Sequence, residues 1–174
     1  PHVRDEIISR LEKATEISKS KISVVEIGGT VGDFQNSLFI EAARVMRMRN
    51  PEDVIFVMVS YLPVPGTIGE MKTKPTQHAV SSLNAYGVQA DFIIARSTHA
   101  LDRKRKEKLA VWCNVSAEHI ISAPDIKNVY EVPVNFERDN IGDAILQSLK
   151  MKLGHKNGEM KKWARFIDKI KTAK

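Results

Sequence analysis

The stretch Val54-Ile-Phe-Val-Met-Val-Ser-Tyr61 decides the fold class, because it is an apolar run of strand length without polar alternation. Such continuous runs are typical of strands that are buried on both faces, as in a parallel sheet covered by helices. The loop over 62–74 that follows is rich in Pro and Gly, and a helix is predicted over 75–86, with Pro75 in its first turn. A buried strand followed by a long loop and a helix indicates an α/β domain.

The same alternation extends in both directions from this run. The sequence predicts further strands over 22–27, 91–95, 119–122 and 130–134. It predicts helices over 3–18, 36–49, 103–112 and 139–151, and a last helix after Gly158 that carries Met160, Trp163, Phe166, Ile167 and Ile170 on one side. This order favours one α/β domain over 1–153 with a mainly parallel sheet, followed by a basic amphipathic helix over 154–174. Because the first predicted element is a helix, we expect an earlier strand of the sheet to be missing from this chain.

Positive charge is concentrated in the tail. The chain has 27 Lys and Arg against 21 Asp and Glu, and residues 150–174 hold nine of the basic and two of the acidic ones. A solvated helical tail explains this excess, and we expect no nucleic acid partner, because the rest of the domain is close to neutral. No apolar run reaches the ~20 residues that a membrane-spanning helix needs, so no membrane is expected. The single cysteine, Cys113, cannot form an internal disulfide, which favours a cytoplasmic protein.

A glycine-rich segment, Glu26-Ile-Gly-Gly-Thr-Val-Gly-Asp33, follows the first predicted strand. In open α/β sheets, ligands bind beyond the carboxyl ends of the strands, which is where this segment lies. Its glycines allow close backbone approach and offer N–H groups to phosphate oxygens, while Glu26 and Asp33 carry carboxylates that suit Mg²⁺. The alternative is a strand-to-helix turn that needs glycine only for its geometry.

A polar segment, Gly69-Glu-Met-Lys-Thr-Lys-Pro-Thr-Gln-His78, follows the second predicted strand. Lys72 and Lys74 precede a predicted helix N-terminus, so their ammonium groups and the N–H groups of that helix form a cradle for a triphosphate. Thr73 adds a hydroxyl, and Gln77 lies on the first turn, where its amide could contact the edge of a base. The alternative is a solvated capping segment, since lysine is usually exposed.

Basic residues also follow the third predicted strand. Arg96 ends that strand and Lys108 lies on the next helix, and these two are candidate ligands. The rest of the run over 103–108 is typical of a solvated helix surface. Cys113 lies in an apolar run, which favours a buried structural thiol over a nucleophile. The five histidines show no metal-ligand spacing, and the chain has no Gly-x-x-x-x-Gly-Lys-Ser/Thr loop.

Four motifs together resemble the CTP synthase family in order and spacing. They are Val25-Glu-Ile-Gly-Gly-Thr-Val-Gly-Asp33, Lys72-Thr-Lys-Pro-Thr-Gln-His78, Cys113-Asn-Val115 and Tyr130-Glu-Val-Pro133. The first two in combination are highly specific, and the resemblance extends from His2 to about Trp163. It implies a Rossmann-like sheet of the P-loop NTPase type, flanked by helices, of which this chain is the C-terminal part of the synthetase (amidoligase) domain.

The resemblance implies an enzyme that makes CTP from UTP, ATP and ammonia, which a separate glutaminase domain releases from glutamine. ATP phosphorylates O4 of UTP and ammonia displaces the phosphate, while Mg²⁺ and lysines offset the charge of two triphosphates. The family also implies feedback inhibition by CTP and a homotetramer, with part of the pyrimidine nucleotide pocket contributed across a subunit interface.

The resemblance assigns roles to individual residues as well. The UTP or CTP site would comprise Asp33, Phe34, Gln35, Lys72, Thr73, Lys74, Gln77 and Lys108, with Lys72 also catalytic. The ATP site would include Gly28, Gly29, Arg96, Asp125 and Ile126, the last three around the adenine, and Glu26 would bind Mg²⁺.

This chain departs from the family at Asp33-Phe34-Gln35, where Asp-Ile-Glu is usual, so one carboxylate of the pyrimidine pocket is lost. The P-loop, an upstream Mg²⁺ aspartate and the glutaminase domain lie outside this sequence, and the tail is expected to begin the linker to that domain. We therefore expect the chain alone to be catalytically incomplete. Three other interpretations stay open: another P-loop ligase of the dethiobiotin synthetase type, a non-catalytic module that binds or assembles with pyrimidine nucleotides, and a basic nucleic-acid protein.

Overall fold

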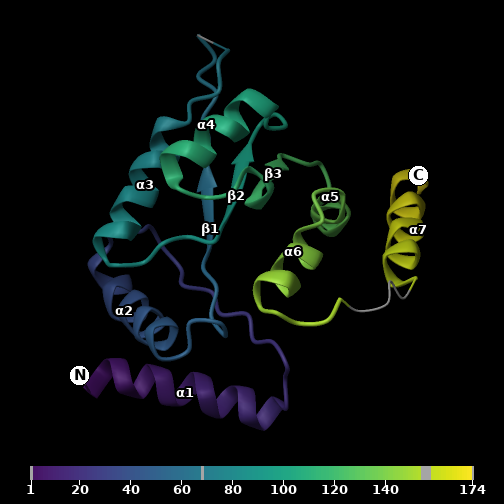
Figure 1. Cartoon of the computed structure of the whole chain (residues 1–174). Coiled ribbons are helices and arrows are strands. Elements are labelled where there is room, and N and C mark those ends of the chain that lie inside the picture. Colours follow the sequence, from purple (N-terminus) through teal and green to yellow (C-terminus); the bar gives the residue numbers. More distant parts are fainter. Residues whose placement is uncertain (1, 68, 154–157, 174) are drawn as a thin grey trace.

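The computed structural model describes residues 2–67, 69–153 and 158–173 (Figure 1). Three parallel strands form one sheet in the order β1-β2-β3, with bounds Val57–Tyr61, Phe92–Ser97 and Ile120–Pro124. The α-helices are α1 (His2–Ser18), α2 (Phe34–Arg49), α3 (Lys74–Ala85), α4 (Arg103–Cys113), α5 (Val132–Arg138), α6 (Ile141–Ser148) and α7 (Glu159–Thr172). Two short 3₁₀ turns, η1 (Ala117–His119) and η2 (Val129–Glu131), precede β3 and α5.

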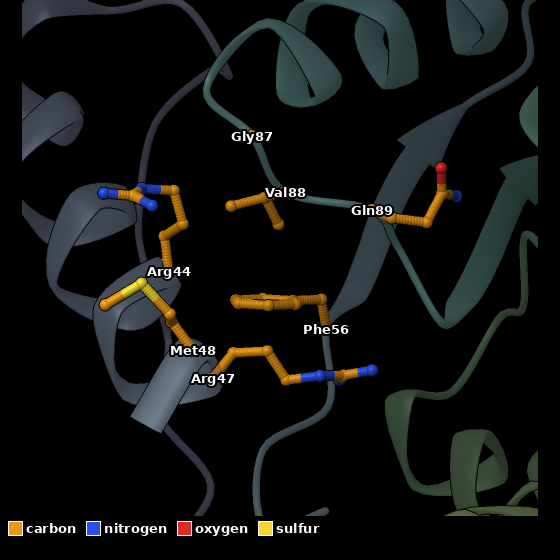
Figure 2. Close-up of a pocket in the computed structure, with 7 residues that line it drawn as sticks. All are labelled: Arg44, Arg47, Met48, Phe56, Gly87, Val88 and Gln89. Atoms are coloured by element: carbon orange, nitrogen blue, oxygen red, sulfur yellow. The ribbon is translucent and has the colours of Figure 1, made fainter. Parts of the chain in front are cut away.

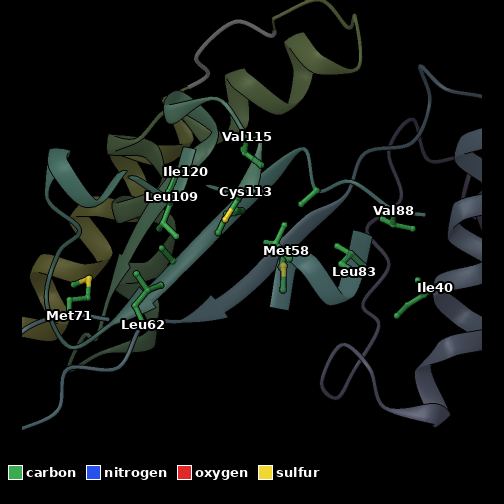
Figure 3. Packing of buried hydrophobic residues seen from close by; sticks show 14 residues of the cluster. Ile40, Met58, Leu62, Met71, Leu83, Val88, Leu109, Cys113, Val115 and Ile120 are labelled. Carbon is green, nitrogen blue, oxygen red and sulfur yellow. The ribbon is translucent and has the colours of Figure 1, made fainter. Parts of the chain in front are cut away.

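Helices α3 and α4 cover one face of the sheet. The register pairs Met58 with Ile93 and Ile93 with Ile120, so these side chains lie in one row on that face. These three residues belong to one cluster with Leu83 of α3 and Leu109 of α4, and all five side chains are buried. Figure 3 shows Met58 near Leu83, and Ile120 near Leu109. Each aliphatic side chain contributes roughly 1.5–3 kcal/mol when fully buried, so this cluster fixes both helices against the strands.

The other face of the sheet is covered unevenly. The ring of Phe92 points to this face, is buried and stacks on His119 at 4.1 Å between centroids, and α5 packs against β3. At β1, by contrast, Val57, Val59 and Tyr61 are exposed on this face. β1 is also an edge strand, because its only strand neighbour among the described residues is β2.

A charged contact joins α2 to the amino ends of the strands. The Arg47 guanidinium donates to both carboxylate oxygens of Asp91, at 2.8 and 3.0 Å, and to the carbonyl of Val54. Asp91 also accepts from the backbone N–H of Phe56 at 2.6 Å. Because Asp91 comes directly before β2, this network fixes α2 relative to β1 and β2.

Helix α1 is held more lightly than the elements around the sheet. It packs on α2 through a small cluster of Ile8, Ala42 and Val45, with Ile7 and Met46 beside it. The two helices lie together below the sheet in Figure 1.

The prediction of a strand over 22–27 is wrong. This segment runs as an extended coil outside the three-stranded sheet (Figure 1), and Val24 is 95% exposed. A strand forms only where a neighbour accepts its N–H groups and donates to its carbonyls. The apolar pattern identified an extended segment correctly, but no strand of the described residues pairs with it.

The prediction of a strand over 130–134 is also wrong, because these residues form η2 and the start of α5. The side-chain oxygen of Asn128 accepts from the N–H of Tyr130 at 3.0 Å, which starts the turn. Pro133 lies in the first turn of α5, where its missing N–H breaks no helical hydrogen bond. The valines around this proline suggested a strand, whereas the capping chemistry favours a helix.

The other predicted elements are confirmed, with ends shifted by a few residues. β1 begins at Val57 rather than at 54, β2 and β3 extend to Ser97 and Pro124, and α6 ends at Ser148. The α/β class with a parallel sheet flanked by helices is therefore confirmed. Within the described ranges, no helix has both the length and the apolar character needed to cross a bilayer.

Candidate functional site

The carboxyl ends of β1 and β2 anchor the long loop that precedes α3. The N–H of Leu62 donates to the carbonyl of Arg96 at 2.7 Å, and the Ser97 hydroxyl donates to the carbonyl of Leu62 at 2.8 Å. At the other end of the loop, the N–H of Lys72 donates to the carbonyl of Pro63 at 2.9 Å. The loop therefore returns to its own beginning and places Lys72 beside the end of β1.

The start of α3 is fixed by two buried threonines. The Thr76 hydroxyl is hydrogen bonded to that of Ser60 on β1, at 2.8 Å, and Thr73 Oγ1 accepts from the side-chain amide of Gln77 at 3.2 Å. Both threonine side chains are thus used inside the fold, whereas Lys74 is exposed. The partial positive charge of a helix N-terminus attracts anions, so this end of α3 presents both backbone N–H groups and ammonium groups.

Two cations from separate elements pair with one carboxylate, Glu70. The Lys72 ammonium lies 2.8 Å from one carboxylate oxygen of Glu70, and the Arg105 guanidinium lies 3.8 Å from the other. The hydrogen bond from Lys72 lowers the pKa of Glu70, and the charges of Lys72, Arg105 and Lys108 lower it further, against a smaller opposing effect of desolvation. The fold therefore brings Lys72 and Arg105, which are far apart in the sequence, to the same carboxylate, and the charge of Lys108 acts on it from the next turn of α4.

Glu70 and Arg105 were missed by the sequence reasoning. Arg105 connects α4 to the long loop, because it pairs with Asp102 and its Nε donates to the carbonyl of Met71 at 3.4 Å. A cavity of about 160 Å³ opens where these elements meet, lined by Val64, Gly69, Met71, His99, Ala100, Asp102 and Arg105. The available signal was the helical spacing of Arg105 and Lys108, which places both on one side of α4.

A second pair of side chains lies at the carboxyl ends of β2 and β3. The Arg96 guanidinium is 3.8 Å from the carboxylate of Asp125, and both are exposed to solvent. The N–H of Asp125 donates to the carbonyl of Ser97 at 2.7 Å, which fixes the start of the loop after β3. Ile126 is the next residue and is half-buried. The structure thus places Arg96 beside Asp125, and Ile126 follows Asp125 in the same loop.

The glycine-rich segment forms a turn at the start of α2. Gly29 has a φ of +79°, and a Cβ at this position would lie 2.5 Å from the side-chain nitrogen of Asn36, so glycine is required. The carboxylate of Asp33 accepts from the N–H of Thr30 at 3.0 Å. Gly28 has open space around its Cα. Turn geometry by itself therefore explains Gly29, and Asp33 is engaged within the turn.

Most other side chains in and just after this segment face solvent. Glu26 and Gln35 are exposed, and Phe34 is 90% exposed. Val31 is half-buried and packs against the main core. Over the ranges that the structure describes, no group of three or more His, Cys, Asp or Glu side chains could hold a metal ion. Glu26 fits Mg²⁺ as a single ligand, since Mg²⁺ at nucleotide sites takes one or two carboxylates, waters and phosphate oxygens.

A larger cavity, of about 320 Å³, lies at the opposite end of the sheet, near the amino ends of β1 and β2. Figure 2 shows its lining residues, Arg44, Arg47, Met48, Phe56, Gly87, Val88 and Gln89. Arg44 is paired with Glu41 at 2.8 Å and Arg47 with Asp91 at 2.8 Å. Arg105 in the smaller cavity is paired as well, so ion pairing does not separate the two cavities. The smaller cavity lies beside the loops that follow the carboxyl ends of β1 and β2, where ligands bind in open α/β sheets, and it is therefore the better candidate.

The family described as CTP synthase N-terminus matches residues 1–151 of this chain. The chain belongs to the CTP synthase N-terminal family. It is 41% identical over 176 residues to a CTP synthase of Pyrococcus horikoshii, which covers all of this chain and 32% of the relative. It is 42% identical over 174 residues to that of Pyrococcus furiosus, and 39% over 172 residues to that of Saccharolobus solfataricus. These alignments cover 99% and 98% of this chain, and 32% of each relative.

The chain therefore spans about a third of the length of the CTP synthases that it matches. The family match ends at residue 151, before α7 begins at Glu159. The part of the chain that the family matches includes Lys72, Arg96 and Lys108.

Proposed function

We propose that this chain supplies the pyrimidine nucleotide site, and part of the Mg-ATP site, of a CTP synthase. The observation that carries the proposal is the pairing of Lys72 and Arg105, from two separate elements, with the one exposed carboxylate of Glu70. Several cations around one exposed carboxylate make a site where phosphate oxygens can replace the carboxylate oxygens. Because the ion pairs of Glu70 are solvated and therefore weak, a triphosphate can displace this side chain without a large penalty.

The nucleotide would lie across the start of α3. Its phosphates would contact Lys72, Lys74 and Lys108, together with the N–H groups at the helix N-terminus. Gln77 lies on the first turn of α3 and would contact the base, while Thr73 and Thr76 hold the turn in place from inside the fold. The same cations that bind the triphosphate of UTP would bind that of CTP, which accounts for a feedback inhibitor at an overlapping site.

The proposed reaction is phosphorylation of O4 of UTP by ATP, followed by displacement of that phosphate by ammonia. Lys72 would offset the negative charge that develops during phosphoryl transfer, which is the main contribution a protein makes to this chemistry. No side chain of the chain has to form a covalent intermediate. The burial of Cys113, which is 1% exposed, is consistent with that.

The ATP side of the site would involve the ends of β2 and β3. Arg96, Asp125 and Ile126 are adjacent there, which supports a common role around the adenine. Gly28 and Gly29 would approach the ATP phosphates with their backbone. Glu26 would bind Mg²⁺, which would neutralise phosphate charge between the two nucleotides.

The incomplete sheet supports a larger, Rossmann-like domain of the P-loop type. β1 has an open edge and exposed Val57, Val59 and Tyr61, although parallel sheets are normally covered on both faces. The unpaired segment over 22–27 also has the composition of a buried strand. Both features are explained if a further strand, carrying the phosphate loop, completes the sheet in the whole enzyme.

The division of the chain follows from the same proposal. Residues 1–153 would form the C-terminal part of the synthetase domain, and 154–174 would begin the linker to a glutaminase domain. The first turns of α2 expose three large apolar side chains, Phe34, Leu38 and Phe39, which supports a subunit contact at this helix. A homotetramer would use this surface near the pyrimidine nucleotide pocket.

The proposal is tested by measuring UTP affinity of the whole enzyme by calorimetry with Lys72→Ala. Loss of one charge-assisted contact to phosphate predicts a roughly 10- to 100-fold weaker affinity. Lys13→Ala is the matched control, since Lys13 is exposed on α1, away from the loop. Both variants should keep the circular dichroism of the parent protein. Unchanged UTP affinity in Lys72→Ala would show that this lysine does not contact the nucleotide.

A further inference from the structure

Helix α7 packs back on the η2 turn through an aromatic cluster. The rings of Tyr130, Trp163 and Phe166 contact one another, with centroid distances of 6.1 Å for Tyr130 to Trp163 and 5.7 Å for Tyr130 to Phe166. Both pairs are edge-on, which is a favoured aromatic geometry. Tyr130 is therefore held between two rings of α7.

A directional hydrogen bond fixes the position of the turn. The indole Nε1–H of Trp163 donates to the backbone carbonyl of Tyr130 at 2.8 Å. One further contact supports this one, because Lys171 pairs with Glu131 at 2.9 Å. Trp163 and Lys171, which lie about two turns apart on α7, therefore both hold η2.

The turn held in this way continues directly from the loop after β3. That loop begins at Asp125, whose N–H is bonded to Ser97, and ends at Asn128, whose side chain caps η2 at Tyr130. The loop is thus fixed at one end by the sheet and at the other end by η2. Its length leaves little freedom for Ile126 once both ends are fixed.

We propose that Trp163 is a positioning residue, which holds the η2 turn and thereby sets the loop at Asp125 and Ile126 for the adenine of ATP. The adenine part of this inference rests on the proposed function. Trp163 touches no substrate in this arrangement and acts through the backbone of Tyr130. Removal of the indole therefore weakens ATP binding while the UTP side, which is built on α3 and α4, is unaffected.

Three variants of the whole enzyme test the inference. Trp163→Ala removes the ring contacts and the donor, whereas Trp163→Phe keeps a ring and removes only the donor. Lys161→Ala is the matched control, because Lys161 is exposed on the same helix. The measurements are hydrogen exchange of the amides over 128–131, and the KM for ATP and for UTP in ammonia-dependent CTP formation.

We expect faster exchange over 128–131 in Trp163→Ala, and a KM for ATP raised about 10-fold, as for loss of roughly 1.4 kcal/mol of positioning energy. The KM for UTP should stay within about 2-fold, and Trp163→Phe should lie between Trp163→Ala and the parent. Equal rises in both KM values would indicate a merely structural role and overturn the inference. Unchanged exchange over 128–131 would overturn it as well.

Asp125→Ala separates failure of this inference from failure of the proposed function. If Asp125→Ala raises the KM for ATP and Trp163→Ala does not, the positioning role is wrong and the ATP site stands. If neither variant changes the KM for ATP, the assignment of the loop to ATP is wrong, and the adenine part of the inference is overturned with it.

Discussion

Two segments that resemble each other in sequence behave differently in the structure. The loop and helix start over 62–77 follow an apolar run and are fixed by contacts to β1, β2 and α4. The segment over 19–33 also contains an apolar run followed by a glycine-rich motif, yet its strand-like part is exposed and unpaired. The first segment finds its hydrogen-bond partners on neighbouring elements, whereas the strand-like part of the second has no strand partner among the described residues.

The difference shows that a strand is a property of a pair of segments. Val24 and Ile93 both belong to apolar runs, but Ile93 is fully buried between two strands and under two helices. The motif that follows each run differs in the same way, because its position depends on whether the run is paired. The lysines over 72–74 are positioned by the chain itself, whereas Glu26 and Gly28 lie in a segment that depends on further contacts for its position.

The largest expected effect is on stability at the sheet. Ile93→Ala should lower the free energy of unfolding by about 2–5 kcal/mol, because it leaves a cavity in the core. Val24→Ala should change it by no more than about 0.5 kcal/mol, since the side chain is almost fully exposed. Urea denaturation of both variants measures the contrast. A loss of several kcal/mol in Val24→Ala would mean that this segment is already paired in the protein tested.

A smaller effect is expected where α2 meets the sheet. Asp91→Ala leaves the Arg47 guanidinium and the N–H of Phe56 without their carboxylate partner, which should cost about 1–3 kcal/mol of stability. Asp53→Ala is the control, because Asp53 is an exposed acidic residue in the turn before β1. Thermal melts of both variants give the comparison. Equal stability of the two variants would mean that this network does not hold α2 in place.

The smallest effect concerns the one cysteine. Burial raises the pKa of the Cys113 thiol to about 11, so at pH 8 a thiol reagent should label the native chain far more slowly than the urea-unfolded chain. Because the folded pKa is above the unfolded one, the contribution of this thiol to stability is complete below about pH 8.5 and declines as pH rises toward 11. Rapid native labelling at pH 8 would contradict the burial of Cys113 at the end of α4.

Much of the fold could be predicted from local patterns. The runs that became β1, β2 and β3 are continuous and apolar, and Pro75 and Pro133 both lie in first turns of helices. The first proline was interpreted correctly and the second was not, because valines flank Pro133 and the capping role of Asn128 was overlooked. The strand over 22–27 could not be rejected from the sequence, since its local pattern is that of a buried strand.

The sequence predicts which residues belong to the candidate site better than it predicts which side chains they contact. Motif and helix position select Lys72 and Lys108, but the ion pair of Lys72 with Glu70 depends on how the loop folds back at Pro63. Thr73 was expected to offer its hydroxyl to a ligand, whereas its side chain is buried and bonded to Gln77. Tertiary packing decides whether such a side chain is buried in the fold or exposed to a ligand.

The open edge of β1 has a consequence for how this chain behaves when it is produced alone. An unpaired strand edge with apolar neighbours recruits the edges of other strands, which leads to self-association and aggregation. The exposed apolar run over 22–27 is a second aggregation-prone segment, of the kind that forms intermolecular β-structure. Yields of soluble material should therefore depend steeply on protein concentration, and charged substitutions at Val59, on the exposed face of β1, should relieve that dependence.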